Sequence, residues 1–220
     1  MLAMDATYPQ PILFKVYILC QESCTVDRTR NTTSGETAVT DVDSTPSMER
    51  ILLLGPPGSG KSTLAKRLGS ELELPVIHLD EHFWEPGWTM PPEVEWIETQ
   101  RALMDRHERW IMDGNYDSTL EVRLPEADTV ILLELGRLRS LYRIAKRWWD
   151  HRGAVREDMA DGCPERFDLE FALYAWSFKE RELPEIKEKI DQFGPDVDTI
   201  TLDASSPEAL EEFIERYTAQ

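Results

Sequence analysis

The chain has 220 residues, and its 42 Asp and Glu against 24 Lys and Arg give a formal net charge of −18. The length suits one domain with an extension, and the acidic balance argues against direct nucleic-acid binding, because neutralising phosphates requires a basic surface. No apolar run approaches the ~20 residues of a membrane span. Three cysteines, Cys20, Cys24 and Cys163, are too few for a disulfide framework or a zinc site. We therefore expect a cytoplasmic protein without a membrane partner, and composition leaves its oligomeric state open.

Lysine is scarce, since only 7 of the 24 cationic residues are Lys. An acidic, lysine-poor surface is typical of a protein that works in high salt, where counterions screen its self-repulsion. The composition thus predicts a halophilic protein. A purified protein that is most stable in low salt would contradict this hypothesis.

Residues 1–47 differ in composition from the rest of the chain. A Thr- and Ser-rich stretch covers residues 29–45, and the one apolar patch, residues 12–20, is interrupted by Lys15. A secretory signal peptide needs a basic start and an uninterrupted apolar segment, which this region lacks. We predict a disordered extension, which a start codon placed too early would also explain. A genuine regulatory arm is the alternative.

The folded domain is expected to cover residues 48–220, and it opens with a phosphate-binding pattern. An apolar run at 51–54 leads into Gly-Pro-Pro-Gly-Ser-Gly-Lys-Ser-Thr at 55–63, and a helix-forming segment follows to about Gly69. This is G-x-x-x-x-G-K-S with a strand before it and a helix after it, the context that the motif requires. Glycine lets the backbone approach an anion, so that successive N–H groups and the helix dipole hold the phosphates. An ordinary Gly/Pro turn is the alternative.

The motif assigns a role to each of its residues. Lys61 would reach the β- and γ-phosphates of ATP, and the Ser62 hydroxyl would coordinate Mg²⁺. The predicted ATP-binding residues are Gly55, Pro56, Pro57, Gly58, Ser59, Gly60, Lys61, Ser62 and Thr63.

Strand and helix patterns alternate along the rest of the domain. Apolar runs predict strands, and apolar periodicity predicts helices. The predicted strands cover residues 50–54, 75–80, 110–113, 128–135 and 197–202. The predicted helices cover residues 93–107, 137–151, 167–183 and a last helix capped by Ser205 or Ser206. A Trp- and Pro-rich loop at 83–92 and a mobile connection at 153–164 join them.

This alternation predicts an α/β protein with the three-layer P-loop NTPase fold, in which helices cover both faces of a five-stranded parallel sheet. Ligands bind such a sheet at the carboxyl ends of its strands. The loop at 55–62 would meet Asp80 and Asp113 at that edge, because each of these acids ends a predicted strand.

Helix 137–151 is unusually basic for this chain. Six cations fall between residues 137 and 152, and three of them, Arg139, Arg143 and Arg147, share one face at four-residue spacing. Another side of the helix carries apolar residues: Leu138, Leu141, Tyr142 and Ala145.

Residues 48–220 resemble the small P-loop kinases related to adenylate kinase, and more closely the group labelled DNA topology modulation proteins. Besides the loop at 55–63, the likeness is carried by His78-Leu-Asp80, by Phe83-Trp84-x-Pro86-Gly87-Trp88, by Trp110-Ile-Met-Asp113-Gly-Asn-Tyr116 and by the arginine-rich helix. Adenylate kinases typically continue Asp-Gly with Phe-Pro-Arg, where this chain has Asn115-Tyr116-Asp117. The acceptor therefore stays open between a nucleotide and another hydroxyl metabolite.

The resemblance implies Mg²⁺-dependent transfer of a phosphoryl group from ATP to a small acceptor. Catalytic roles would fall to Lys61, Asp80, Arg143 and Arg147, the two arginines belonging to a lid at about 137–165. Asp113 would join Ser62 near the metal. The acceptor would meet Asp80, Trp84, Trp88, Asp113, Tyr116 and Arg123.

Each of these residues also has a structural interpretation. Asp113 before Gly114 suits a turn, Asp80 suits a helix cap or the surface, and the two tryptophans suit a cluster that pins their loop. Arg143 and Arg147 suit a solvated helix face. His78 and His82 flank Asp80, but no third ligand at diagnostic spacing supports a metal site. The alternative function is an ATP-binding regulatory protein linked to DNA topology, without a small-molecule acceptor, and a simple ATPase ranks after it.

Overall fold

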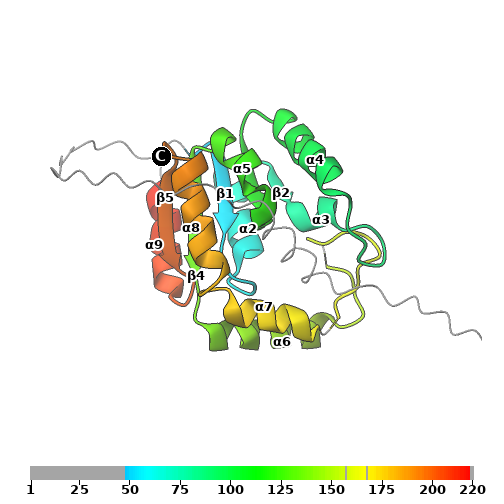
Figure 1. Ribbon diagram of the computed structural model, residues 1–220. Helices are drawn as coiled ribbons and strands as arrows, with labels where there is room; N and C mark the ends of the chain where they lie inside the picture. Colours follow the sequence, from blue (N-terminus) through cyan, green and yellow to red (C-terminus); the bar gives the residue numbers. More distant parts are fainter. Residues whose placement is uncertain (1–47, 157, 167, 219–220) are drawn as a thin grey trace, which may run out of the picture. The chain divides into compact units, whose positions relative to one another are not determined.

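A computed structural model describes residues 48–156, 158–166 and 168–218 (Figure 1). The extension predicted at residues 1–47 lies outside the described residues. Within the described ranges, no helix is long and apolar enough to cross a membrane.

Five strands form one parallel sheet in the order β2-β3-β1-β4-β5. They are β1 (Arg50–Leu54), β2 (Val76–His78), β3 (Trp110–Asp113), β4 (Thr129–Glu134) and β5 (Asp198–Asp203). The central strand β1 is fully buried from Ile51 to Leu54, as expected for a parallel strand that helices cover on both faces. The predicted α/β fold and its five parallel strands are therefore confirmed.

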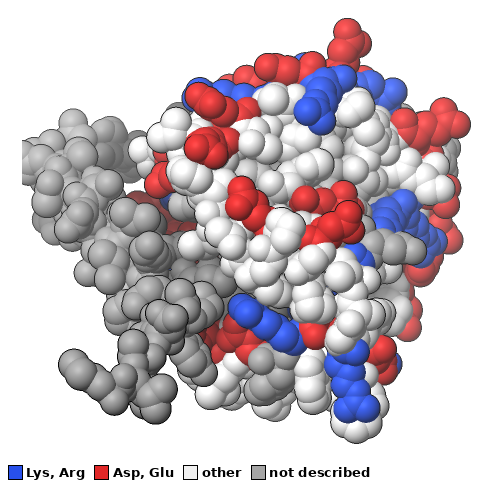
Figure 2. Space-filling view, turned by 90° about the vertical axis from the view of Figure 1, so that its right-hand side faces the viewer, with Lys and Arg blue, Asp and Glu red and all other residues white. Residues whose placement is uncertain are grey.

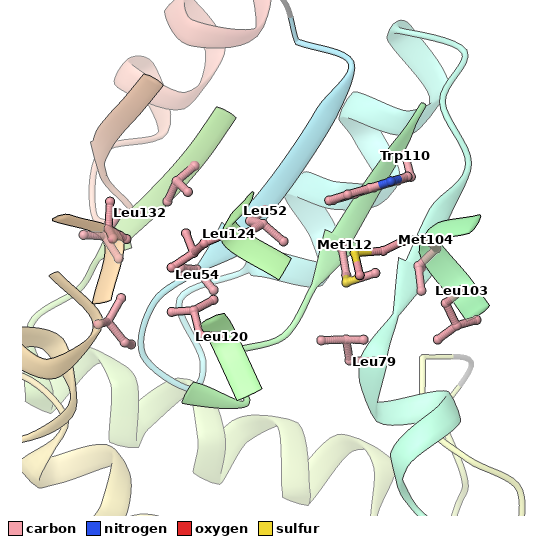
Figure 3. Packing of buried hydrophobic residues seen from close by; sticks show 14 of the residues in the cluster. Leu52, Leu54, Leu79, Leu103, Met104, Trp110, Met112, Leu120, Leu124 and Leu132 are labelled. Carbon is pink, nitrogen blue, oxygen red and sulfur yellow. The ribbon is translucent and has the colours of Figure 1, made fainter. Parts of the chain in front are cut away.

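Alternating residues of β1 serve two separate cores, because successive side chains of a strand point to opposite faces. Ile51 and Leu53 pack with α2 (Lys61–Glu71) and α9 (Pro207–Thr218). Leu52 and Leu54 pack on the other face with α4 (Glu93–Asp105), α5 (Leu120–Arg123) and α8 (Glu182–Phe193) (Figure 3). Two short 3-10 helices, η1 (Asp117–Thr119) and η2 (Leu124–Glu126), flank α5.

The second predicted strand is shorter than expected. It ends at His78, and Leu79 and Asp80 begin the short helix α3 (Leu79–Phe83). Leu79 is fully buried in the core. The negative charge of Asp80 is stabilised by the positive end of the helix dipole. Asp80 therefore lies in a first helical turn and not at the end of a strand.

The helix predicted at 167–183 is divided in two. The helix α7 covers Leu169–Ser177, and α8 begins at Glu182; residue 167 lies outside the described ranges. Phe178 is 1 % exposed and anchors the corner between the two helices in the core. Pro184 lies in the first turn of α8, where a missing N–H does not break a helical hydrogen bond.

The helix α6 (Arg137–His151) has the predicted bounds and lies beside α7 beyond the carboxyl end of the sheet (Figure 1). The two helices are antiparallel, since the guanidinium of Arg137 lies over Trp176 and that of Arg147 lies over Phe171. Ser140 and Ile144 are the buried residues of α6. The predicted apolar side of α6 does not face the core, because Leu138 and Tyr142 are exposed to solvent.

Candidate active site

The loop at residues 55–63 follows a path that requires glycine. Gly55, Gly58 and Gly60 have φ angles of +141°, +74° and +96°, which side-chain-bearing residues rarely adopt. A Cβ atom on Gly55 would lie 2.5 Å from the carbonyl oxygen of Leu133. The loop is thus pressed against β4, and the backbone N–H groups at the start of α2 stay available for an anion.

Side chains from two other elements hold this loop in place. The Asn115 amide accepts a hydrogen bond from Gly55 N at 3.0 Å and donates one to Gly55 O at 2.9 Å. From α6, Ser140 Oγ donates to Pro57 O at 2.6 Å. The Arg143 guanidinium donates to the carbonyls of Ser59 at 3.1 Å, Gly58 at 3.3 Å and Ala204 at 3.1 Å.

Arg143 has a use that its predicted role as a phosphate clamp did not include. Both terminal nitrogens of its guanidinium donate to carbonyl oxygens of the loop and of the connection between β5 and α9. A guanidinium that donates to several carbonyls orders the backbone around it. Arg143 therefore positions the loop.

Lys61 lies at the centre of the site. Its Nζ donates to Gly55 O at 2.9 Å and to Pro56 O at 3.1 Å. Burial lowers the pKa of Lys61, and the negative charges of Asp113 and Asp80 oppose that effect. Both predicted acids therefore lie close enough to Lys61 to act on its charge, as the sheet topology suggested.

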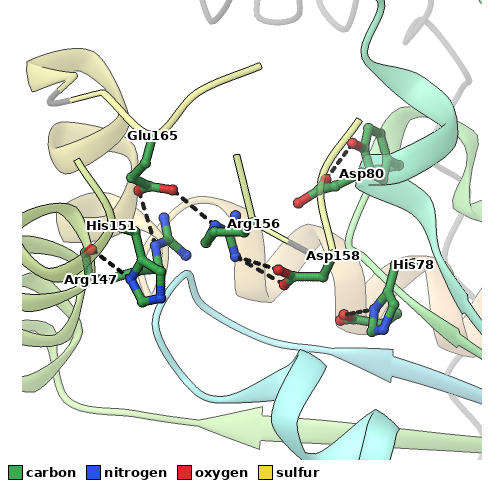
Figure 4. A network of polar contacts seen from close by, with 9 residues as sticks. His78, Asp80, Arg147, His151, Arg156, Asp158 and Glu165 are labelled. Carbon is green, nitrogen blue, oxygen red and sulfur yellow. Dashed lines mark hydrogen bonds and ion pairs between the residues drawn. The ribbon is translucent and has the colours of Figure 1, made fainter. Parts of the chain in front are cut away.

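Asp113 forms a buried pair with His78. The two side chains are 6 % and 8 % exposed, and Oδ2 of Asp113 lies 3.0 Å from Nδ1 of His78 (Figure 4). Burial alone would lower the pKa of His78, but the hydrogen bond and charge of Asp113 raise it. Among the described residues, His78, Asp80 and His82 do not form a group with metal-ligand geometry. His78 instead orients the carboxylate of Asp113.

Asp80 is held by Tyr116, whose hydroxyl donates to Oδ1 at 2.5 Å. Burial raises the pKa of Asp80, and this hydrogen bond partly offsets the rise. The Tyr116 ring packs against Phe83 and Trp96, at centroid distances of 4.6 and 5.1 Å. Tyr116 thus fixes the direction of the carboxylate beside an aromatic wall.

The prediction that Arg123 faces the acceptor is wrong. The residue is 0 % exposed, and its guanidinium donates to the backbone carbonyls of Gly114 (3.0 Å), Asn115 and Tyr116 (3.1 Å). Burial lowers the pKa of Arg123 to about 10. Asn115 holds the phosphate loop and Tyr116 holds Asp80. By fixing the backbone of these two residues, Arg123 stabilises both contacts indirectly.

Residues 152–156 and 158–166, which we call the lid segment, reach into the site through ion pairs (Figure 4). Glu165 accepts from Arg147 Nε at 3.1 Å and from Arg156 Nε at 2.9 Å. Arg156 also contacts both carboxylate oxygens of Asp158. The residues predicted as a mobile connection are therefore tied to α6.

The far end of this network contacts Ser62 of the phosphate loop and acts on Asp80 through its charge. Burial alone would raise the pKa of Asp158, but the charge of Arg156 and a hydrogen bond from Ser62 contribute to lowering it. The positive charge of Arg156 also acts on Asp80. The sequence reasoning missed Arg156, Asp158 and Glu165. Their only signal was the pattern Arg156-x-Asp158 inside a segment interpreted as a linker.

The tryptophan loop packs against the same lid segment. The rings of Trp84 and Trp88 lie 5.3 Å apart and contact a small cluster of Met159, Ala160 and Cys163. Gly87 N donates to Gly162 O at 3.2 Å, and the Cys163 thiol donates to Glu85 O. The two tryptophans therefore join the loop after α3 to the lid.

The side chains present fit a triphosphate with Mg²⁺. The loop offers backbone N–H groups in a glycine cradle, and the buried Ser59 Oγ has no hydrogen-bond partner. Lys61 supplies a cation, while the Ser62 hydroxyl and the Asp113 carboxylate are oxygen ligands of the kind that Mg²⁺ prefers. Asn115, Ser140 and Arg143 keep the cradle in shape.

Comparisons with known proteins agree with this geometry. The model of the family described as "ATPase family associated with various cellular activities (AAA)" matches residues 51–85. An adenylate kinase of Clavibacter michiganensis subsp. michiganensis (strain NCPPB 382) is 29 % identical over 121 residues, which cover 52 % of this chain and 58 % of that protein. The chain thus spans less than two thirds of this relative's length.

Two solved structures are also similar. A shikimate kinase from Bacteroides thetaiotaomicron has a TM-score of 0.46 at 17 % identity, covering 79 % of this chain and 98 % of that one. A sugar kinase from Janibacter sp. HTCC2649 has a TM-score of 0.44 at 18 % identity, covering 78 % and 93 %. The parallel sheet, the loop geometry and the matched segment 51–85 together identify a three-layer P-loop NTPase fold with its nucleotide-binding loop at 55–63.

Proposed function

We propose that this protein is a kinase that transfers the γ-phosphoryl group of ATP to a hydroxyl group of a small acceptor. The observation that carries the proposal is the placement of Asp80 and Asp113 beside the loop lysine, where both act on the charge of Lys61. Phosphoryl transfer depends on positioning and on neutralising charge. The similarity to an adenylate kinase over 121 residues supports phosphoryl transfer from ATP.

The residues of the site form two groups, one that binds the phosphates and Mg²⁺ and one that binds the acceptor. The loop at 55–63 binds the phosphates, with Lys61 as its cation, and Ser62 together with Asp113 would hold Mg²⁺. When bound, this ion would neutralise charge on the phosphate oxygens. His78 keeps the Asp113 carboxylate in one orientation through the 3.0 Å contact.

Asp80 is the residue that we assign to the acceptor. Its burial-raised pKa brings the carboxyl closer to the working pH, which suits a group that accepts a proton from a hydroxyl. Tyr116 holds this carboxylate through one oxygen. The second oxygen can then orient the acceptor.

Two arginines, one on α6 and one in the lid segment, complete the proposed site. Arg147 and Arg156 share Glu165 as an anionic partner. Phosphate oxygens can replace a carboxylate on a guanidinium, because both groups offer two oxygen acceptors to its planar fork of N–H groups. We assign Arg147 and Arg156 to the charge on the transferred phosphoryl group.

The surroundings of Asp80 favour an acceptor that carries no phosphate. Arg123, the predicted acceptor arginine, is in the core, and the neighbours of Tyr116 are the aromatic rings of Phe83 and Trp96. Figure 2 shows the side of the molecule with α3 and α4, where acidic side chains interrupt a broad uncharged area. A ring-bearing alcohol such as a nucleoside or a sugar suits this wall better than a nucleotide.

An acceptor screen tests the proposal. ATP consumption and thermal stability should be measured in molar KCl with nucleosides, sugars and nucleoside monophosphates, because a ligand of the folded state raises its melting temperature. We expect an uncharged hydroxyl compound to stimulate turnover, and Asp80→Asn to reduce that turnover by ~100-fold or more while ATP still stabilises the protein. Turnover that no acceptor stimulates, together with partner binding gated by ATP, would favour the ATP-binding regulatory protein linked to DNA topology.

A further inference from the structure

Most of the large apolar side chains that are exposed among the described residues lie on one pair of helices, α6 and α7. Of eight such side chains, six lie on these helices and a seventh, Val155, lies in the connection between them. The eighth, Val94, lies alone on α4. Scattered apolar residues on a surface need no explanation, but a contiguous patch marks a site of interaction.

On α6, three of them form a stripe. Leu138, Tyr142 and Trp149 are 75 %, 67 % and 62 % exposed, and their spacing of four and seven residues places them on one face of the helix. The opposite face carries Ser140 and Arg143, which bind the phosphate loop. The stripe therefore points away from the active site.

On α7, Leu169, Leu173 and Trp176 also share one face, at a spacing of four and three residues, and are 63 %, 59 % and 42 % exposed. The other side of α7 carries Tyr174, which packs with the core as does Phe178 just after the helix. The second stripe therefore also points away from the sheet.

The two stripes form one surface, which we call the α6–α7 face. The helices are in contact and antiparallel, and Arg137 of α6 lies 5.3 Å from the Trp176 ring centroid of α7. A large aromatic side chain presents ~150–250 Å², so the six partly exposed residues present on the order of 700 Å² of apolar surface. A folded chain does not leave such a surface to water without a reason.

We propose that the α6–α7 face is the interface of a homodimer, in which each copy of the chain covers the face of the other. A standard interface removes ~800 Å² from each partner, which matches the apolar area of this face with a polar rim. A two-fold axis through the face pairs the same patch with itself. Two antiparallel helix pairs then pack as a four-helix layer.

The charges around the face permit this contact. Arg137 pairs with Glu180, Lys146 pairs with Asp150, and Arg152 lies over the Trp149 ring at 4.4 Å. Two copies can meet without burying cations that have lost their partners. Elsewhere the net charge of −18 opposes self-association. Salt screens that repulsion, so the dimer is tighter at high ionic strength.

Sedimentation velocity of the full chain at micromolar concentrations, in low and in molar KCl, tests the proposal. We expect a dimer that is tighter in molar KCl. Leu138→Glu and Leu173→Glu should each weaken association by ~30-fold or more, because each buries an unpaired carboxylate in the interface. Val94→Glu is the matched control, since it adds the same charge at an apolar site 68 % exposed on α4, and it should leave the dimer unchanged.

Two further measurements keep the outcome clear. ATP should stabilise all three variants against heat as it stabilises the wild type, because the stripes lie opposite the residues that hold the loop. The milder Leu138→Ser should weaken the dimer less than Leu138→Glu if the glutamate variant proves poorly folded. A wild type that stays monomeric would overturn the proposal, whether the face then binds residues 1–47, a lipid vesicle or an oligonucleotide. A dimer that tolerates both face variants would overturn it as well.

Discussion

The phosphate loop and the lid segment meet at Ser62 and Asp158, yet different interactions hold them. The loop follows a buried central strand and is shaped by positive-φ glycines and by hydrogen bonds to its own backbone. The lid segment is held by a chain of ion pairs from Arg147 to Asp158 and by its contact with Trp84 and Trp88. A backbone cradle is formed before the ligand arrives, whereas the lid guanidiniums can exchange a carboxylate partner for a phosphate. We therefore expect the loop to bind the phosphates and the lid arginines to move onto the ligand after it has bound.

The largest expected effect comes from removing the one cation of the loop. Lys61→Ala should lower ATP turnover by at least ~1000-fold, about 4 kcal/mol in activation free energy. Lys66→Ala, an exposed position on the same helix α2, is the matched control and should keep near-normal turnover. Steady-state ATP consumption measures both variants, and retained turnover in Lys61→Ala would remove the loop from the mechanism.

Adding a methyl group to the loop tests whether its backbone is held more rigidly than the lid segment. Gly55→Ala places a Cβ 2.5 Å from Leu133 O at a φ of +141°, so it should lower the free energy of unfolding by ~3 kcal/mol or more. Gly136→Ala is the control, because its Cβ would meet nothing within 4 Å. Denaturant unfolding measures both variants. Equal free energies of unfolding for the two variants would show that the loop backbone can shift to accommodate a side chain.

On the lid side, we expect a loss of catalysis with little loss of stability. Arg156→Ala removes a cation that acts on Asp80 and pairs with Glu165, and it should lower kcat/KM by ~100-fold, about 2.7 kcal/mol. Arg101→Ala on the exposed side of α4 is the control. Unfolding curves should be alike for both variants. A loss of unfolding free energy in Arg156→Ala that matches its loss of activation free energy would mean that the contacts of the lid are as rigid as those of the loop.

The smallest expected effect lies behind the loop, where η1 meets α8. Burial and the charge of Asp117 raise the pKa of Glu182 from 4.5 to about 7. Because the folded state holds this proton more tightly, the stabilisation is complete below the unfolded pKa of 4.5 and is lost as the pH rises through about 7. Glu182→Gln should therefore stabilise the protein at about pH 8 by roughly 1 kcal/mol, a value reduced for the partial exposure of the group. No gain is expected at about pH 5.

Thermal unfolding at both pH values measures this effect. Glu188→Gln on the exposed side of the same helix α8 provides the control and should change stability equally at both values. An equal gain for Glu182→Gln at both pH values would rule out its titration as the cause.

Parts of the active site could be predicted because their signals are local in the chain. The bounds of β1 and β3 follow from apolar runs, and the loop follows from glycine spacing and its lysine. Asp113 could be placed beside the loop because the carboxyl ends of parallel strands share one edge. The contact of Arg143 with the loop carbonyls could not be predicted, since helical spacing shows that a residue shares a face without showing what that face meets.

The amino-acid sequence by itself determined the alternation of strands and helices, the parallel sheet and the nucleotide loop, because short-range sterics and apolar periodicity decide these features. Only the tertiary structure decided that Asn115 holds Gly55, that Arg123 lies in the core and that Glu165 joins two arginines. Asn115 and Gly55 are 60 positions apart, and no local pattern records which polar group will meet another once the chain has closed. The same closure leaves the apolar stripes of α6 and α7 facing outward, although their spacing alone resembles that of helices buried in a core.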